Sequence, residues 1–183
     1  SYETEFLGAS PENKYVVAGI DERVKIRADF SKFKFLSGSL QMEAVAHYQY
    51  YIPFRGLKFD TSKSDDGMLR FAFYFDALEC ETPVKYSEIK CDVRESSISD
   101  GVNAKIAEYK KSEFPQYLAE RSKSAQNMLR ARIDAEVSLK KYVLENVLAP
   151  AGFPADKIGA IDIIFDTQKF EAFKSGVRNG GER

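Results

Sequence analysis

The stretch from residue 40 to residue 52 alternates between apolar and more polar side chains, and this alternation limits what the chain can fold into. Side chains two positions apart share one face of a β-strand, so the pattern predicts a long strand with one buried face. Pro53 ends the run because proline has no backbone N–H for a strand ladder. We expect neighbouring strands on both sides, and Gln41 and Gln49 more exposed than Tyr48 and Tyr50. The predicted core face consists of Leu40, Met42, Ala44, Ala46, Tyr48, Tyr50 and Ile52.

The same period of two recurs in segments that we predict as strands over 14–30, 68–78 and 84–93, and an apolar segment predicts a final strand over 158–165. In the second of these, Phe71, Phe73 and Phe75 share one face, which we interpret as core. A polar turn is expected at 60–67 and another at 81–83. Consecutive strands joined by short turns favour antiparallel pairing.

Helical patterns begin after residue 98. Ser99 or Asp100 is expected to cap a helix that runs to Lys111, and Pro115 to begin a long helix that ends near Leu148. Arg132 and Glu136 lie within its apolar stripe, four residues apart, where they can pair. The stripe consists of Leu118, Ala125, Leu129, Ile133, Leu139, Val143 and Val147.

The length of this helix, about 50 Å at 1.5 Å per residue, exceeds the expected width of the sheet. Part of the helix is therefore expected to overhang or bend. We expect the overhang at its start, near Tyr117, Leu118 and Arg121, where a protein partner or a second copy would bind.

The predicted elements follow the order of an α+β fold, in which strands come first, helices follow and one strand returns at the end. The sequence predicts a mainly antiparallel sheet, covered on one face by the long amphipathic helix, with a returning C-terminal strand. We expect a tail over 1–13, a single domain over 14–175 and a frayed C-terminus over 176–183.

Charge and hydropathy restrict the partners. The 27 basic and 28 acidic residues give a net charge of −1, which does not favour a nucleic acid partner. No apolar run reaches the length of a bilayer-spanning helix. The chain starts at Ser1 rather than Met, so we expect that an upstream segment was removed, and membrane association only through that segment.

Side chains for catalysis or metal binding are few. The single histidine, His47, lies on the more polar face of its strand; Glu43 is four residues away, roughly 13 Å, so the two do not pair. Cys80 and Cys91 lack metal-ligand spacing and are placed unevenly about the turn at 81–83, so we predict two free thiols. The sequence therefore assigns no catalytic, cofactor-binding or metal-ligating residue.

Four segments carry a family resemblance: YYIPFRGLKFD at 50–60, TPVKYSEI at 82–89, LENVLAPAGF at 144–153 and IDIIFD at 161–166. Across roughly residues 24–166, their order resembles the uncharacterised bacterial membrane-anchored family called domain of unknown function 4230. The resemblance implies a soluble domain of the cell envelope that follows a hydrophobic segment. It supplies no catalytic residues.

A non-enzymatic, envelope-associated binding or assembly domain is the interpretation we favour. One alternative is a hydrolase or isomerase whose site is assembled from scattered polar residues; this predicts a deep polar pocket containing His47 or a cysteine. Another alternative is a carrier of a small apolar ligand, which predicts an apolar pocket. A location outside the envelope, in the cytoplasm, stays open.

Overall fold

Two β-sheets and a chain of helices make up the computed structural model, which describes residues 2–4, 14–29, 39–53, 56–94, 104 and 106–165. The predicted α+β class is confirmed. The chain divides into two compact units: unit 1 contains Ser1–Ala18, Tyr50–Glu79 and Ala131–Arg183, and unit 2 contains Gly19–Gln49 and Cys80–Arg130. No single cut in the sequence separates the units, and a single domain over 14–175 stays a prediction.

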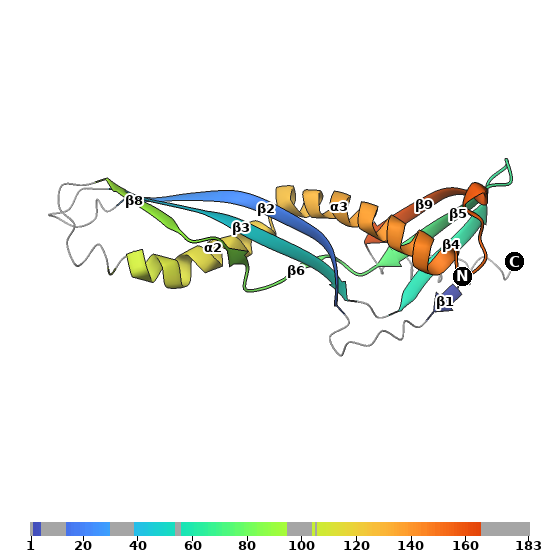
Figure 1. The fold of residues 1–183 in the computed structure, drawn as a ribbon, viewed down its shortest axis with the longest axis horizontal. Helices are drawn as coiled ribbons and strands as arrows, with labels where there is room; N and C mark the ends of the chain where they lie inside the picture. Colours follow the sequence, from blue (N-terminus) through green and yellow to red (C-terminus); the bar gives the residue numbers. More distant parts are fainter. Residues whose placement is uncertain are drawn as a thin grey trace, which may run out of the picture. The chain divides into compact units, whose positions relative to one another are not determined.

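The sheet of unit 1 has the strand order β1-β4-β5-β9. Its strands are β1 (Tyr2–Thr4), β4 (Leu57–Lys63), β5 (Leu69–Phe75) and β9 (Ile158–Phe165). Residues 2–4 therefore form a strand, although the sequence places them in a tail. β4 and β5 pair antiparallel, whereas the returning strand β9 pairs parallel to β5, beside which it lies in Figure 1.

The turn between β4 and β5 is shorter than predicted, because β4 continues to Lys63 and only Ser64–Gly67 form the turn. Gly67 has a φ of 84°, a left-handed conformation that glycine adopts without strain. The carboxylate oxygen Oδ1 of Asp66 accepts hydrogen bonds from Ser64 Oγ at 2.5 Å and from Met68 N at 3.0 Å. Hydrogen bonds from Ser64 and then Met68 lower the pKa of Asp66.

Phenylalanines form the core of unit 1, as the alternation over 68–78 predicts. Phe71 and Phe73 are fully buried, and Phe59 stacks on Phe73 with ring centroids 5.0 Å apart. Phe153 meets Phe71 edge-on at 5.1 Å. These contacts confirm that Phe71 and Phe73 are core side chains.

The second sheet, most of whose residues belong to unit 2, centres on β3 (Ser39–Pro53). β3 is bonded to β2 (Lys14–Asp29) and to the short strands β6 (Glu79–Cys80), β7 (Lys85–Tyr86) and β8 (Lys90–Arg94). Every even-numbered residue from Leu40 to Ile52 is at most 3% exposed, whereas Gln49 is exposed. The predicted alternation of β3 is therefore confirmed in full.

The turn expected at 81–83 does not reverse the chain, because residues 81–94 run along one edge of β3. Glu81 N donates to Gln49 O, Lys85 lies opposite His47, and Lys90 lies opposite Glu43. Pro83 lacks the N–H that a ladder needs, so the edge is interrupted there and resumes at β7.

The helical part differs from the prediction in where it breaks. Helical structure passes without interruption from 106–108 through the π-helix η1 (Tyr109–Glu113) into α2 (Phe114–Ser122), so no break separates Lys111 from Pro115. The break instead falls at residues 123–124, before α3 (Ala125–Val143) and the π-helix η2 (Leu144–Leu148). A short 3-10 helix, η3 (Ala155–Lys157), precedes β9. The predicted caps Ser99 and Asp100 lie outside the described residues.

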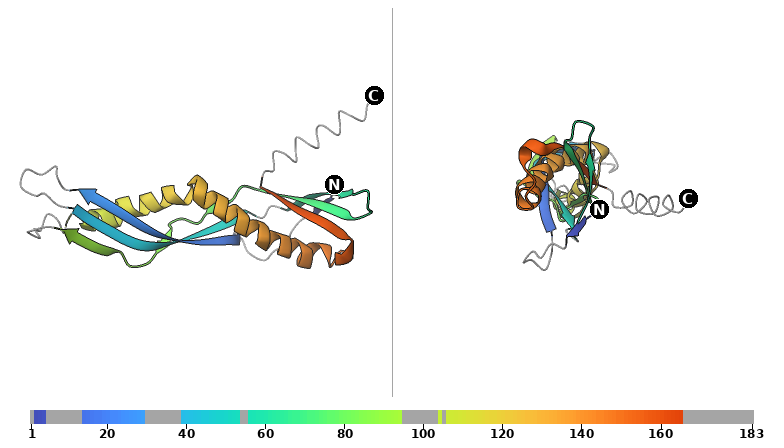
Figure 2. Two further views of the ribbon diagram at one scale, coloured as in Figure 1. Left: turned by 90° about the horizontal axis from the view of Figure 1, so that it is seen from above. Right: turned by 90° about the vertical axis from the view of Figure 1, so that its right-hand side faces the viewer.

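The start of the long helix is not an overhang. Figure 2 shows α2 running along β2 and β3, and the ring of its Phe114 meets Tyr86 edge-on at 5.3 Å. Leu118 is fully buried. The expectation of a partner surface at Leu118 is therefore wrong, because this side chain belongs to the core of unit 2.

The buried face of α3 also differs from the predicted stripe. Leu139 and Val143 are buried as expected, but Leu129 and Ile133 are exposed. The buried positions recur every four residues, at Asn127, Ala131, Ala135, Leu139 and Val143. Glu136 pairs at 2.7 Å with Lys140, four residues after it, whereas the sequence suggests Arg132, four residues before it.

Candidate functional site

Glu22 is a charged residue on the buried face of β2. Its neighbours two positions away, Ile20 and Val24, are buried core residues. The side chain of Glu22 is only 16% exposed. A carboxylate in such a place is stable only with hydrogen-bond partners or a countercharge, so Glu22 marks a candidate site.

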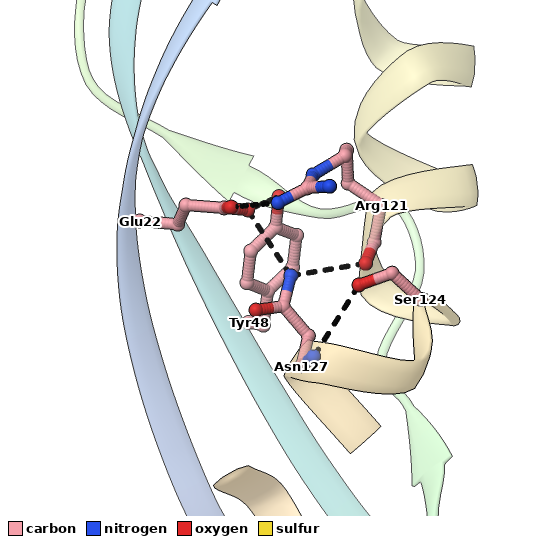
Figure 3. A network of polar contacts seen from close by, with 5 residues as sticks. All are labelled: Glu22, Tyr48, Arg121, Ser124 and Asn127. Atoms are coloured by element: carbon pink, nitrogen blue, oxygen red, sulfur yellow. Dashed lines mark hydrogen bonds and ion pairs between the residues drawn. The ribbon is translucent and has the colours of Figure 1, made fainter. Parts of the chain in front are cut away.

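Three side chains from three elements donate to this carboxylate (Figure 3). Tyr48 of β3 donates its hydroxyl to Oε2 at 2.9 Å, and Asn127 of α3 donates Nδ2 to the same oxygen at 3.1 Å. Arg121, in the last turn of α2, forms an ion pair with Oε1. We call Glu22, Tyr48, Arg121 and Asn127 the Glu22 network; all four residues belong to unit 2.

The Glu22 network also holds the break between α2 and α3. Asn127 Nδ2 donates to the backbone carbonyl of Arg121 at 3.0 Å, which satisfies an acceptor at the end of α2. Ser124 Oγ accepts from Asn127 N at 3.3 Å and so caps the start of α3. The amide oxygen Oδ1 of Asn127 is buried and accepts no hydrogen bond within the described part of the chain.

Electrostatics make Glu22 a poor acid or base at neutral pH. Burial alone would raise the pKa of Glu22, but the hydrogen bonds from Arg121, Asn127 and Tyr48 outweigh burial and hold the pKa below its ordinary value. A general base works best with a pKa near the working pH. With its oxygens already bonded to these donors, Glu22 acts as an anchor for the helices rather than as a catalytic group.

His47 has a carboxylate partner that the sequence analysis missed. Its Nδ1 lies 2.7 Å from Asp21 Oδ1 on the neighbouring strand β2, and the two side chains are 46% and 71% exposed. The expected lack of pairing with Glu43 is correct, because Glu43 lies 3.4 Å from both Arg23 and Lys25. These polar pairs lie one after another on the solvent-exposed face of the sheet.

Both cysteines are free thiols, as predicted. The reason is their separation along one edge of β3, and not their uneven placement about a turn at 81–83. Cys80 and Cys91 follow one another along the same edge of β3, near Gln49 and opposite Met42 respectively. Seven residues of strand separate those positions, about 23 Å, which no disulfide spans. Burial raises the pKa of Cys80, so its thiol is a weak nucleophile.

A pocket of about 390 Å³ in unit 2 lies between β2 and the helical segment. Its lining consists of Ile26, Tyr109, Glu113, Gln116, Tyr117 and Glu120. His47, Cys80 and Cys91 are not among these residues, so the pocket does not have the composition that the enzyme alternative predicts.

The exposed side of α3 carries a row of large aliphatic side chains. Leu129, Ile133 and Val137 follow one another at intervals of four residues and are 61%, 56% and 68% exposed. We call these three residues the α3 stripe. All three belong to one continuous helix, so helix geometry alone sets their spacing, about 6 Å between neighbours along the axis.

Comparisons with known proteins give no relative: no family model, no curated protein and no solved structure matches the chain. In the described ranges, no helix is long and apolar enough to cross a membrane. The same residues contain no group of three or more histidine, cysteine or acidic side chains able to hold a metal ion.

Proposed function

We propose that the chain is a non-enzymatic assembly domain that binds another protein chain through the α3 stripe. The observation that carries this proposal is an inversion of side-chain size on α3. The helix buries Ala131 and Ala135 while it exposes Leu129, Ile133 and Val137. A helix that serves only its own fold buries its large aliphatic side chains.

Single exposed aliphatic residues are ordinary on protein surfaces and need no explanation. The α3 stripe differs because its members are neighbours on one helix face and form a continuous apolar surface. Burying the exposed part of the three side chains would contribute roughly 3 kcal/mol. A free energy of this size strengthens binding by about two orders of magnitude, whereas the domain folds without it.

Two polar side chains support the non-enzymatic part of the proposal, because each has a structural role. Glu22 anchors two helices to the sheet, and His47 is paired with Asp21 on the open face of the sheet. A location in the cell envelope remains a second proposal, supported only by the family resemblance in the sequence.

A photo-crosslinking residue placed on the helix tests the assembly function. p-Benzoylphenylalanine would replace Ile133 in one variant and Ser138, an exposed residue outside the stripe, in the control. After irradiation of cells that produce the chain, we expect adducts heavier than the chain from position 133 and far fewer from position 138. Equal yields at both positions, or adducts at neither, would contradict the proposal.

A further inference from the structure

The α3 stripe is flanked on both sides by charges in the same order. On one flank Arg130 precedes Asp134, and on the other Arg132 precedes Glu136, each pair four residues apart. Arg130, Arg132 and Asp134 are exposed, and Glu136 is half-buried and also pairs with Lys140 of its own helix. Each flank therefore reads basic and then acidic along the direction of the helix.

This order makes the surface complementary to itself when one copy is reversed. We propose that the α3 stripe binds the α3 stripe of a second copy of this chain, antiparallel, about a two-fold axis at Ile133. Ile133 then meets Ile133 of the second copy, and Leu129 meets its Val137. The inference rests on the proposed assembly function and names the partner.

The charges on the flanks fix the direction. In the antiparallel pair each flank faces the same flank of the second copy, reversed. Arg130 then lies about 3 Å along the axis from Asp134 of the second copy, and Arg132 a similar distance from its Glu136. Both distances are within reach of an arginine side chain, and two-fold symmetry doubles each pair. Each flank then has two attractive pairs and one repulsive pair at this separation, which is Asp134 with its copy on one flank and Arg132 with its copy on the other.

A parallel pair would bring unlike flanks together. Glu136 would then lie near Asp134 of the second copy, and Arg132 near its Arg130, so each contact between flanks has two repulsive pairs. Asp134 with Arg132 of the second copy would be the one attractive pair at the same separation. Like charges in such positions oppose association. The order of charges therefore favours the antiparallel arrangement over the parallel one.

The spacing of the stripe predicts the geometry and strength of the contact. Residues four apart form the ridges that pack at a crossing angle of about 50°. Helices that cross so steeply touch over a short length, which matches a stripe about 12 Å long. Three side chains per copy bury less than a standard interface, so we expect a dissociation constant of about 10–100 µM.

Sedimentation velocity of the full chain tests the association. We expect a shift from monomer to dimer between about 1 µM and about 500 µM, which brackets the expected dissociation constant. Ile133→Asp should abolish the dimer, because it places two carboxylates at the symmetry axis. Ser138→Asp, the matched control, should dimerise like the wild type. A chain that stays monomeric throughout, or variants that behave alike, would overturn the inference.

Charge reversal tests the direction. Arg130→Asp alone and Asp134→Arg alone each place like charges together twice, and each should associate about tenfold more weakly than the wild type. An equal mixture of the two variants restores both ion pairs and should associate within about threefold of the wild type. A rearrangement inside one helix cannot produce this rescue.

The outcomes separate the two proposals. A mixture that is no stronger than its components would overturn the antiparallel register. A chain that stays monomeric at all concentrations, but forms adducts with a different protein at position 133, would show that the partner is not a second copy. The proposed assembly function would still hold. Crosslinks confined to one chain would overturn both, because they would show that the chain covers its own stripe.

Discussion

Replacing Glu22 by glutamine tests the anchoring role of the Glu22 network. The substitution keeps the size of the side chain, removes its charge and presents an amide nitrogen to donors. Arg121 then loses the countercharge of Glu22, and at most part of the hydrogen bonding from Tyr48 and Asn127 is kept. Hydrogen bonds to a charged group contribute about 1.5–3 kcal/mol each.

The size of the effect follows from burial. Removing one partner of a fully buried ion pair costs about 3–5 kcal/mol. Here the side chains of Glu22 and Arg121 are 16% and 31% exposed, so water partly compensates the arginine. We therefore expect Glu22→Gln to lower the free energy of unfolding by about 2–3 kcal/mol at pH 7. In a chain of 183 residues this corresponds to a Tm lower by about 5–10 °C.

The effect should also depend on pH. The folded-state pKa of Glu22 lies below its ordinary value, so its contribution is present above the unfolded pKa of about 4.3 and is lost as the pH falls through the folded pKa. Wild type and Glu22→Gln should therefore differ most near pH 7 and converge at the acid end of the range in which the chain still folds.

Urea unfolding followed by far-ultraviolet circular dichroism measures both effects. The control is Glu43→Gln, which removes a carboxylate with two longer ion pairs on the open face of the same sheet. We expect this control to cost less than about 1 kcal/mol. If Glu22→Gln costs no more than Glu43→Gln, or if the difference from wild type persists unchanged in acid, the anchoring role is wrong.

Three further predictions concern single side chains. His47→Ala should change the free energy of unfolding by less than about 1 kcal/mol in urea titrations, because its ion pair is exposed; a larger loss would show that the pair supports the sheet. Leu118→Ala should cost about 3 kcal/mol, whereas Leu129→Ala in dilute solution should cost under about 0.5 kcal/mol, since only the first side chain is buried; equal losses would contradict the assignment of faces. Gly159→Ala should lower the Tm because the new Cβ would lie 2.9 Å from the Cβ of a neighbouring side chain, whereas Gly19→Ala meets nothing within 4 Å and should not; equal melting temperatures would refute the clash.

Strict alternation made β3 predictable from sequence. Its buried face carries only apolar or aromatic residues, and a shift of one position would place all of them in water. The same holds for β5, where Phe71 and Phe73 leave a single choice of buried face. Local pattern and burial agree in both strands, so the period of two was sufficient.

Where local signals compete, the sequence was a weaker guide. Thr82 and Pro83 are typical turn residues, yet the chain continues along β3 because that edge still offers backbone partners. The buried face of α3 contains alanines. A prediction that assigns large aliphatic side chains to the core therefore placed Leu129 and Ile133 on the buried face, although both are exposed. The sequence did contain a sign of the site at Glu22. This residue is a charged side chain on the same strand face as Ile20 and Val24, and a charge on a buried face requires a partner.

The parallel pairing of β9 with β5 has a consequence for the order in which the chain is synthesised and folds. The residues of unit 2 end at Arg130, so they are all available before β9 leaves the ribosome. Ile158 pairs with Leu69, far back in the sequence, and until it arrives one edge of β5 has no partner. Pairing at such sequence separation is slow, and an open edge next to Phe71 and Phe73 is prone to join edges of other nascent chains. Unit 1 therefore has its greatest risk of aggregation in the interval between the synthesis of β5 and the synthesis of β9.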